Sequence, residues 1–482
     1  MVGLVSACIP ACCVAATFNE RIAAYTDPAN AIVLTEGEAF ALPAPEGGAS
    51  YVNMSAHRFL AIDGNTLTAK NAGIGAFQVK DSSGELVATV PVFVTPADRQ
   101  IDNIYIFKFG NASKYNWSNP ASWVKYGSAV QDGFPNGEND AAFIPIPCTK
   151  TFTVTVDGSF SLASLYCSTY VNGPWNYQHF INGGVGDGTS SLTFFGITGK
   201  NPVPAKFMLA GQQSSGEIVS YKIGGSSLTE RIAFRIGRGT LDVDCGGPTD
   251  RVFSESDARS NRIWFNSGVT YDIPSDCTLR FVNGIRRRRT FVMDDQMNNV
   301  FHISIAGDVF NGSGTLEFDS CSAILLCDNA LRNFTGRIRS QSLNYIRNQN
   351  SNRSCILWSG MVDAPEAIGE INGFCDRNFN AANGVGAWGS GNSHGYGDPN
   401  KLLGNGLPGL GLIMNGGILQ LLGLKKTGSD ETFLKRADGK YEGLYRTGAL
   451  CVGKGFSYID NSYSGTDGDW VISHFIADRV TH

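Results

Sequence analysis

The sequence predicts an all-β protein in which a small Ig-like β-sandwich is followed by a right-handed parallel β-helix, or β-solenoid. Short apolar alternations of period two recur along most of the chain, separated by turns rich in Gly and Asn. The apolar runs lie about 8–20 residues apart without a strict repeat, which favours stacked rungs with variable loops. Charged residues make up only 17% of the chain, which is typical of extracellular β proteins.

Composition excludes several classes of protein. The 58 glycines follow no Gly-X-Y period, so the chain is not collagen. A hydrophobic content of 42% is too high for a disordered chain. The net charge of −5 provides no electrostatic footprint for nucleic acid.

The clearest β texture lies in residues 301–339. Apolar and polar residues alternate over Phe301–Ile305 and again over Leu316–Phe318, and further apolar runs follow. Between the two alternations, Asn311–Gly314 predicts a tight turn, because Asn and Gly tolerate positive φ.

Residues 2–16 form an apolar run that carries no charged side chain. Small residues at Val14–Ala16 suit cleavage, so we interpret 1–16 as a secretory signal peptide whose true start lies a few residues upstream. Two alternatives stay open, namely a lipobox ending at Cys8 and a buried N-terminal strand. The signal interpretation predicts a secreted or cell-surface protein without an integral membrane span.

Residues 17–98 are predicted to form the small β-sandwich, with several short strands at regular spacing from residue 31 to 96. Four features of this unit resemble bacterial immunoglobulin-like domains of group 2. They are Glu36-Gly37-Glu38, the strand Leu67–Lys70, the Ala72–Gly75 turn and the closing strand Val87–Val94. The resemblance implies a spacer or adhesive module of a cell-surface protein.

Residues 99–148 contain an unusual aromatic segment with Trp117 and Trp123. The stretches Tyr115–Trp123 and Gly133–Pro145 resemble the entry segment of bacterial surface β-solenoid proteins, including those with autotransporter-like repeats. Two Trp residues six apart can cover the open end of a strand stack. The alternative is carbohydrate binding, because an indole face can stack on a sugar ring.

Residues 149–482 are predicted to form the β-helix. Predicted strands include Phe152–Val156, Ser191–Phe195, Arg262–Phe265 and Thr278–Val282. The phrases Gly312–Leu316 and Phe334–Ile338 resemble repeats of autotransporter-type β-helices.

The chain has 12 cysteines and no Cys-x-x-Cys pair. Cys321 and Cys327, on neighbouring predicted strands, could form a disulfide. The alternative, which we favour for at least half of the cysteines, is a small core residue.

One charge run stands out from the chain. It comprises Arg286, Arg287, Arg288 and Arg289, followed by Asp294 and Asp295. Arginine beside calcium-holding carboxylates would suit a polysaccharide lyase. A solvated loop that docks an acidic partner is the simpler interpretation, because a core rejects inward-facing Arg. A Gly-rich turn with Asp187 resembles a calcium-binding turn, so calcium is the one cofactor considered.

No convincing catalytic constellation appears in the sequence, so we expect a structural or adhesive surface protein, such as a subunit of a surface layer, sheath or filament. Its expected partners are copies of itself or other cell-surface components, with polysaccharide as a further candidate. The alternatives are a carbohydrate-active β-helix enzyme and a carbohydrate-binding surface protein.

Overall fold

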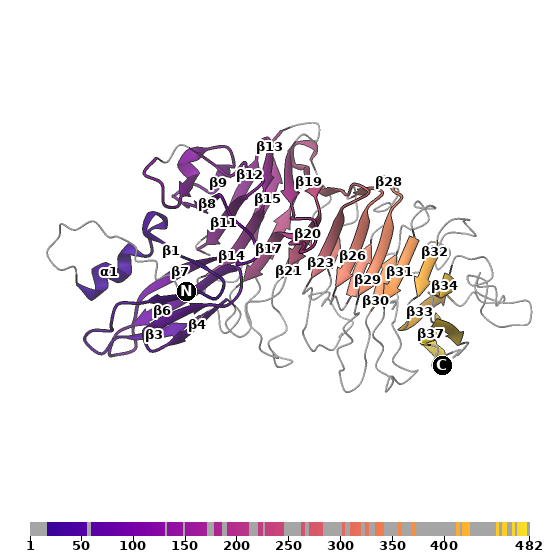
Figure 1. Cartoon of the computed structure of the whole chain (residues 1–482), viewed down its shortest axis with the longest axis horizontal. Helices are drawn as coiled ribbons and strands as arrows, with labels where there is room; N and C mark the ends of the chain where they lie inside the picture. The colour runs from indigo at the N-terminus through magenta and orange to yellow at the C-terminus, as the bar shows by residue number, and fades with distance from the viewer. Residues whose placement is uncertain are drawn as a thin grey trace, which may run out of the picture.

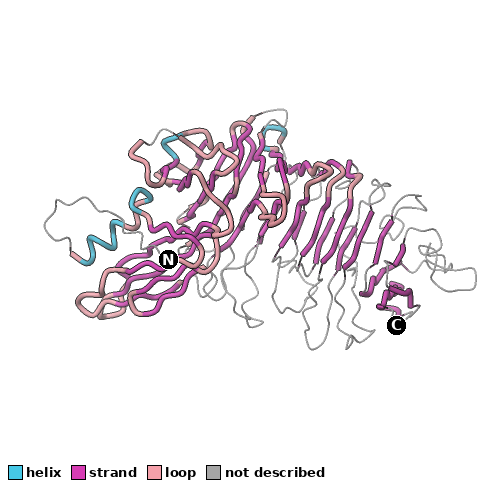
Figure 2. The backbone as a smooth tube through the Cα atoms, viewed as in Figure 1, coloured by secondary structure: helices cyan, strands magenta, loops and turns pink. Residues whose placement is uncertain are grey.

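The structure is a computed structural model, and nearly all regular structure in its described residues is β-strand (Figure 2). This confirms the all-β class. Within the described part of the chain, no helix has the length and hydropathy needed to span a membrane. The described residues are 17–54, 59–130, 133–147, 150–170, 178–185, 190–211, 220–224, 227–244, 262–265, 269–282, 301–303, 309–319, 323–326, 333–341, 355–358, 368–372, 411–414, 417–424, 450–452, 456–459, 465–467 and 470–479.

Two small sheets come first in the chain, and we call them the N-terminal sheets. The four-stranded sheet contains, from edge to edge, β1 (Ile32–Thr35), β7 (Leu86–Thr95), β6 (Gly73–Lys80) and β3 (Ser50–Asn53). The three-stranded sheet contains β2 (Ala39–Ala41), β5 (Thr66–Ala69) and β4 (Leu60–Asp63). Both sheets contribute to one core, for example through Leu60, Leu67 and Phe77. The sequence did not predict β3 and β4.

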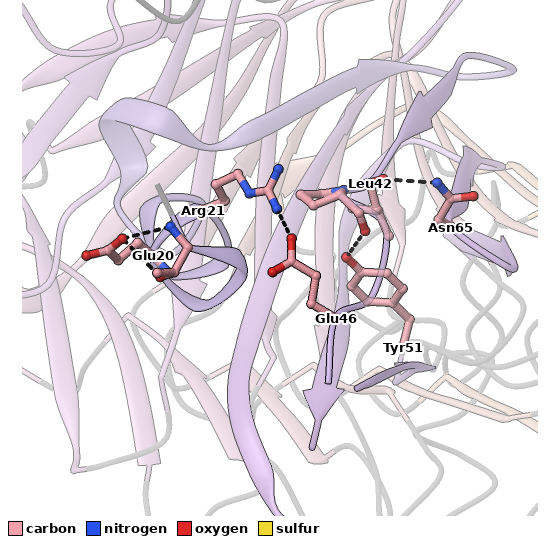
Figure 3. A network of polar contacts seen from close by, with 8 residues as sticks. Glu20, Arg21, Leu42, Glu46, Tyr51 and Asn65 are labelled. Atoms are coloured by element: carbon pink, nitrogen blue, oxygen red, sulfur yellow. Dashed lines mark hydrogen bonds and ion pairs between the residues drawn. The ribbon is translucent and has the colours of Figure 1, made fainter. Parts of the chain in front are cut away.

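A short helix, α1 (Phe18–Ala24), precedes these sheets. Its first turn has a capping box, in which the Thr17 side chain accepts from the Glu20 N–H and Glu20 accepts from the Thr17 N–H. Phe18 and Ile22 are buried on one side of the helix. Arg21 forms an ion pair with Glu46, close to the hydrogen bond from Asn65 to the Leu42 carbonyl (Figure 3). The helix is therefore anchored to the N-terminal sheets by both apolar and polar contacts.

Three long sheets follow, and their strands succeed one another along the long axis of the molecule (Figure 1). The twelve-stranded sheet contains β10 (Trp123–Lys125), β8 (Asn103–Phe107), β11 (Asp140–Ile146), β14 (Ser164–Thr169), β17 (Ala205–Gly211), β20 (Thr240–Asp244), β23 (Thr278–Val282), β26 (Thr315–Asp319), β29 (Arg337–Gln341), β31 (Ile368–Asn372), β32 (Gly411–Met414) and β34 (Leu450–Val452). The eight-stranded sheet contains β30 (Cys355–Trp358), β27 (Ala323–Leu326), β24 (Phe301–Ile303), β21 (Arg262–Phe265), β18 (Ser220–Ile223), β15 (Gln178–Gly183), β12 (Phe152–Val156) and β9 (Lys114–Asn116). The six-stranded sheet contains β13 (Ser159–Leu162), β16 (Ser191–Phe195), β19 (Ile232–Arg238), β22 (Val269–Asp272), β25 (Val309–Gly312) and β28 (Asn333–Phe334).

From β11 to β30, consecutive strands belong to three different sheets in a repeating order. β14, β15 and β16 enter the twelve-, eight- and six-stranded sheets in turn, and β17, β18 and β19 do the same. From β11 to β27, each strand pairs in parallel with the strand three places later, as β14 does with β17. Further along, β29 pairs with β31 and β31 pairs with β32. We call one such set of three strands a rung. Because β8, β9 and β11 already belong to these sheets, the strand stack begins before residue 149, earlier than the predicted boundary.

The apolar residues of each rung stack on those of the next. Leu241, Leu279 and Leu316 are register partners in the twelve-stranded sheet, and all three are fully buried. This row explains the alternation in the sequence, because every second side chain of a strand points to the same face.

The predicted turn at Asn311–Gly314 has a different role in the structure. β25 runs through Gly312 and β26 starts at Thr315, but they lie in the six- and twelve-stranded sheets and do not pair with each other. Gly312 has φ of 101°, and a Cβ on Gly314 would lie 2.2 Å from the Pro274 carbonyl oxygen. The glycines therefore form a corner between two sheets, not a hairpin.

The N-terminal sheets pack against the first rungs of the long sheets. The rings of Phe93 in β7 and Phe143 in β11 meet edge to face at 5.4 Å. A Cβ on Gly73, which has φ of 146°, would lie 2.5 Å from the Phe59 ring and 3.1 Å from the Met208 sulfur. Gly73 thus allows β6 to approach β17 closely.

The last strands of the chain form a separate antiparallel sheet. Its order is β33 (Gly417–Leu424), β37 (Trp470–Arg479) and β35 (Phe456–Ile459), and β36 (Gly465–Asp467) also pairs with β37. β33 and β37 pair with each other along the whole length of β33.

Two cysteines in the described residues, Cys167 and Cys277, are buried free thiols. Burial raises the pKa of the Cys167 thiol, so little reactive thiolate exists at neutral pH. We expect iodoacetamide to leave Cys167 unmodified in the folded protein and to alkylate it in urea, as measured by peptide mass spectrometry. Equal alkylation under both conditions would contradict the buried position.

Candidate functional site

Most of the site residues predicted from the sequence lie outside the described residues. This holds for Arg286, Arg287, Arg288, Arg289, Asp294 and Asp295, for Asp187, and for Cys321 and Cys327. Their roles in docking, calcium binding and disulfide formation therefore stay predictions. Among the residues that the structure does describe, no group of three or more His, Cys, Asp and Glu side chains is placed to hold a metal ion.

Trp117 and Trp123 are both described, and both are buried. Trp117 is 0% exposed, and its indole N–H donates to the Pro135 carbonyl at 3.0 Å. Trp123 lies in β10 and donates to the Trp117 carbonyl at 2.7 Å. Stacking on a sugar needs an exposed indole face, so this pair does not form the sugar-binding surface that was one interpretation of the sequence.

The structure instead brings together a row of charged side chains across the twelve-stranded sheet. Lys206, Asp242, Arg280 and Glu317 are successive register partners in β17, β20, β23 and β26. They alternate with the inward-facing leucines, so they occupy the opposite face of the sheet. We call these four residues the charged row. In the backbone register, the partner of Glu317 in β29 is Arg339, and the partner of Arg339 in β31 is Glu370.

Arg280 is the centre of the charged row. Its Nε and Nη2 donate to the two carboxylate oxygens of Asp242 at 2.8 and 3.0 Å. Its Nη1 lies 3.9 Å from a carboxylate oxygen of Glu317. Asp242 and Glu317 are each 5% exposed. The two parallel hydrogen bonds between Arg280 and Asp242 are the bidentate geometry that makes arginine–carboxylate pairs strong.

Burial dominates the electrostatics of Asp242 in the charged row. It raises the pKa of the Asp242 carboxyl above its ordinary value, and the hydrogen bonds and charge of Arg280, with the charge of Lys206, oppose this shift. A carboxylate removed from water needs a cation beside it. Each acidic group of the row is therefore tied to a basic neighbour one rung away.

A second polar row crosses the six-stranded sheet. Arg235 donates from Nε to Asp272 at 3.1 Å, and Asn311 donates to the other oxygen of Asp272 at 2.9 Å. Arg235 also donates to the Ser191 hydroxyl at 3.2 Å. This row is more open, since the Arg235 and Asp272 side chains are 42% and 36% exposed. Both rows can join neighbouring rungs, and their carboxylates are engaged in doing so.

The charged row left a signal in the sequence that was not recognised. Three of the four strands that carry it share the pattern Thr-Leu-charged-apolar, at Thr240–Val243, Thr278–Phe281 and Thr315–Phe318. The Thr and charged positions share one face and the apolar positions share the other. Aligning these phrases places Asp, Arg and Glu at equivalent positions, which is the register of the structure.

Comparison of the chain with protein-family models, curated proteins and solved structures finds no match.

Proposed function

We propose that the protein is a secreted or cell-surface structural protein, a subunit of a surface layer, sheath or filament that can also act as an adhesin. In this proposal the N-terminal sheets are an immunoglobulin-like sandwich and the long sheets form a right-handed parallel β-helix. The sandwich assignment is supported by the resemblance of the sequence. The β-helix assignment is supported by a resemblance and also by the repeating order of the strands in the long sheets.

The charged row is the observation that carries the proposal. Its carboxylates have the burial of a reactive site, but Arg280 holds Asp242 in a bidentate pair and also faces Glu317. A general acid or base needs a group that can reach its substrate. Groups tied across rungs support the extended scaffold, and they suit a structural role better than a catalytic one.

Assembly can be tested by electron microscopy of the purified full chain at high concentration, with and without calcium. We expect ordered filaments or sheets, because a rigid scaffold with long parallel sheets offers repeated surfaces for packing. If filaments or sheets form only in the presence of calcium, the interpretation of the Asp187 turn as a calcium site gains support.

Dispersed monomers under both conditions would contradict the assembly proposal. The same preparation would then be incubated with acidic polysaccharides and analysed for shortened chains. Cleavage would favour the enzyme alternative, and binding without cleavage would favour an adhesin that does not assemble.

A further inference from the structure

β9 is the edge strand of the eight-stranded sheet, near the start of the strand stack (Figure 1). Its residues line a pocket. Its volume is about 420 Å³, within the usual range for ligand sites. The chain from the end of β8 to the 3-10 helix η2 (Pro120–Ser122) builds its walls. We call it the lysine pocket, and its polar lining consists of Lys108, Lys114, Tyr115, Asn116, Asn119 and Ser122.

The walls of the lysine pocket are held in place by their own hydrogen bonds. The Tyr115 hydroxyl lies 2.9 Å from both the N and O atoms of Gly110 and 2.8 Å from the Ala112 carbonyl oxygen, which fixes the turn before β9. The Asn119 side chain accepts from the Ala121 N–H at 3.1 Å and caps η2. Such a preformed pocket loses little entropy when a ligand binds.

The pocket is basic although the chain as a whole is acidic. Lys108 and Lys114 line it, and no Asp or Glu does. Lys150 adds a third cation close by, because its ammonium group donates to the carbonyl of Asn111 in the same turn. Lys108, Lys114 and Lys150 form no ion pair with a described carboxylate. Clustered positive charge in a concave surface attracts anions.

The remaining lining favours a sugar over a peptide. Amides of Asn116 and Asn119 can donate to and accept from hydroxyl groups, and the largest apolar side chains in the lining apart from the Tyr115 ring belong to alanines. Peptide anchors usually need larger apolar contacts.

Lys108 also lines a second pocket of about 270 Å³. Aromatic residues make much of that lining, among them Tyr25, Phe109 and Tyr170, which are partly exposed. Aromatic rings offer flat apolar faces for the apolar face of a sugar ring. A chain of sugars could therefore place an acidic group between Lys108 and Lys114 and a neighbouring ring in the second pocket.

We propose that the lysine pocket binds an acidic polysaccharide, with Lys108 and Lys114 holding its carboxylate or sulfate groups. The proposal does not rest on assembly of the protein. In this proposal the sugar contacts the exposed lysines Lys108 and Lys114, and not the buried Trp117 and Trp123.

The test compares the full-length protein with the double variant Lys108→Gln/Lys114→Gln. The matched control is Lys70→Gln/Lys200→Gln, which removes the same charge at two exposed lysines outside the pocket. Binding is measured by titration calorimetry with polygalacturonate and dextran sulfate, and with neutral dextran and polyglutamate for comparison. The two acidic polysaccharides distinguish carboxylate from sulfate as the recognised group.

We expect wild type and the control variant to bind at least one acidic polysaccharide, and the pocket variant to bind it roughly tenfold more weakly. No binding by wild type, or an equal loss in both variants, would overturn the proposal. Polyglutamate binding as tight as that of the polysaccharides would also overturn it, because charge alone would then explain the interaction.

Discussion

Replacing Arg280 by Met should lower the free energy of unfolding by about 3 kcal/mol at pH 7, because the buried Asp242 carboxylate then loses its bidentate cation. Removing one partner of a buried pair costs about 3–5 kcal/mol, and the lower end applies here since the Arg280 side chain is 30% exposed. The change is measured from urea unfolding followed by circular dichroism.

Arg235→Met is the matched control for this prediction. Arg235 makes the same kind of contact in the six-stranded sheet, but its ion pair with Asp272 is open to solvent. Exposed pairs contribute about 0–1 kcal/mol, so this variant should be much less destabilised. Equal losses in the two variants would show that burial does not distinguish the rows.

The pH dependence of the Arg280→Met effect gives a second check. Without Arg280, the pKa of Asp242 should rise further, because burial then acts without the opposing cation. Lowering the pH protonates the carboxyl and removes the unpaired charge, so the penalty should shrink in acid. A penalty that stays constant from pH 7 to pH 4 would instead indicate lost packing of the arginine stem.

Strands were the most predictable part of this fold. Phe152–Val156, Ser191–Phe195, Arg262–Phe265 and Thr278–Val282 have the predicted bounds in the structure. In Phe152–Val156 and Thr278–Val282, apolar and polar residues alternate because one face of the strand meets the core. The pairing of strands was not predictable in the same way, since Asp242 and Arg280 are 38 residues apart and the loops between rungs vary in length.

Helix α1 was missed although its start has a sequence signature. Thr17 and Glu20 have the spacing of a capping box, directly before Phe18. The helix has only seven residues, too few for a helical period to show, and its apolar side packs on sheets that lie later in the chain. Its stability comes from this packing, which local sequence does not reveal.

The candidate site was predicted only in part. The sequence identified the segment around Trp117 and Trp123 but not the burial of both indoles, which depends on neighbours such as Pro135 and Phe160. A charged site was predicted at 286–289 because its four arginines are consecutive in the sequence. Those of the charged row are spread one per strand, so only the register of the sheet brings them together.

His179 should make the protein sensitive to acid. It lies in β15, where it is 3% exposed and stacks on the Phe152 ring at 6.1 Å. Burial lowers the pKa of His179 to about 4, because the charged imidazolium is costly away from water. In the unfolded chain the pKa of histidine is about 6.5.

The sign of the effect follows from which state binds the proton first. Between pH 6.5 and pH 4 the unfolded chain is protonated at His179 and the folded chain is not, so stability falls as the pH falls. A pKa difference of this size corresponds to about 3 kcal/mol over the whole interval. Above pH 6.5 the group should have no influence, because it is neutral in both states.

The substitution His179→Phe should remove this part of the acid sensitivity while keeping a ring to pack on Phe152. We expect the difference in unfolding free energy between variant and wild type to shift by about 3 kcal/mol between pH 7 and pH 4, in favour of the variant in acid.

His179→Gln separates titration from packing, since it should flatten the same dependence of stability on pH while losing stability at every pH. Because Asp242 titrates with the opposite sign and is present in all three proteins, its contribution cancels in the comparison. A slope that is unchanged in both variants would mean that His179 takes up its proton equally well in the folded and unfolded chains.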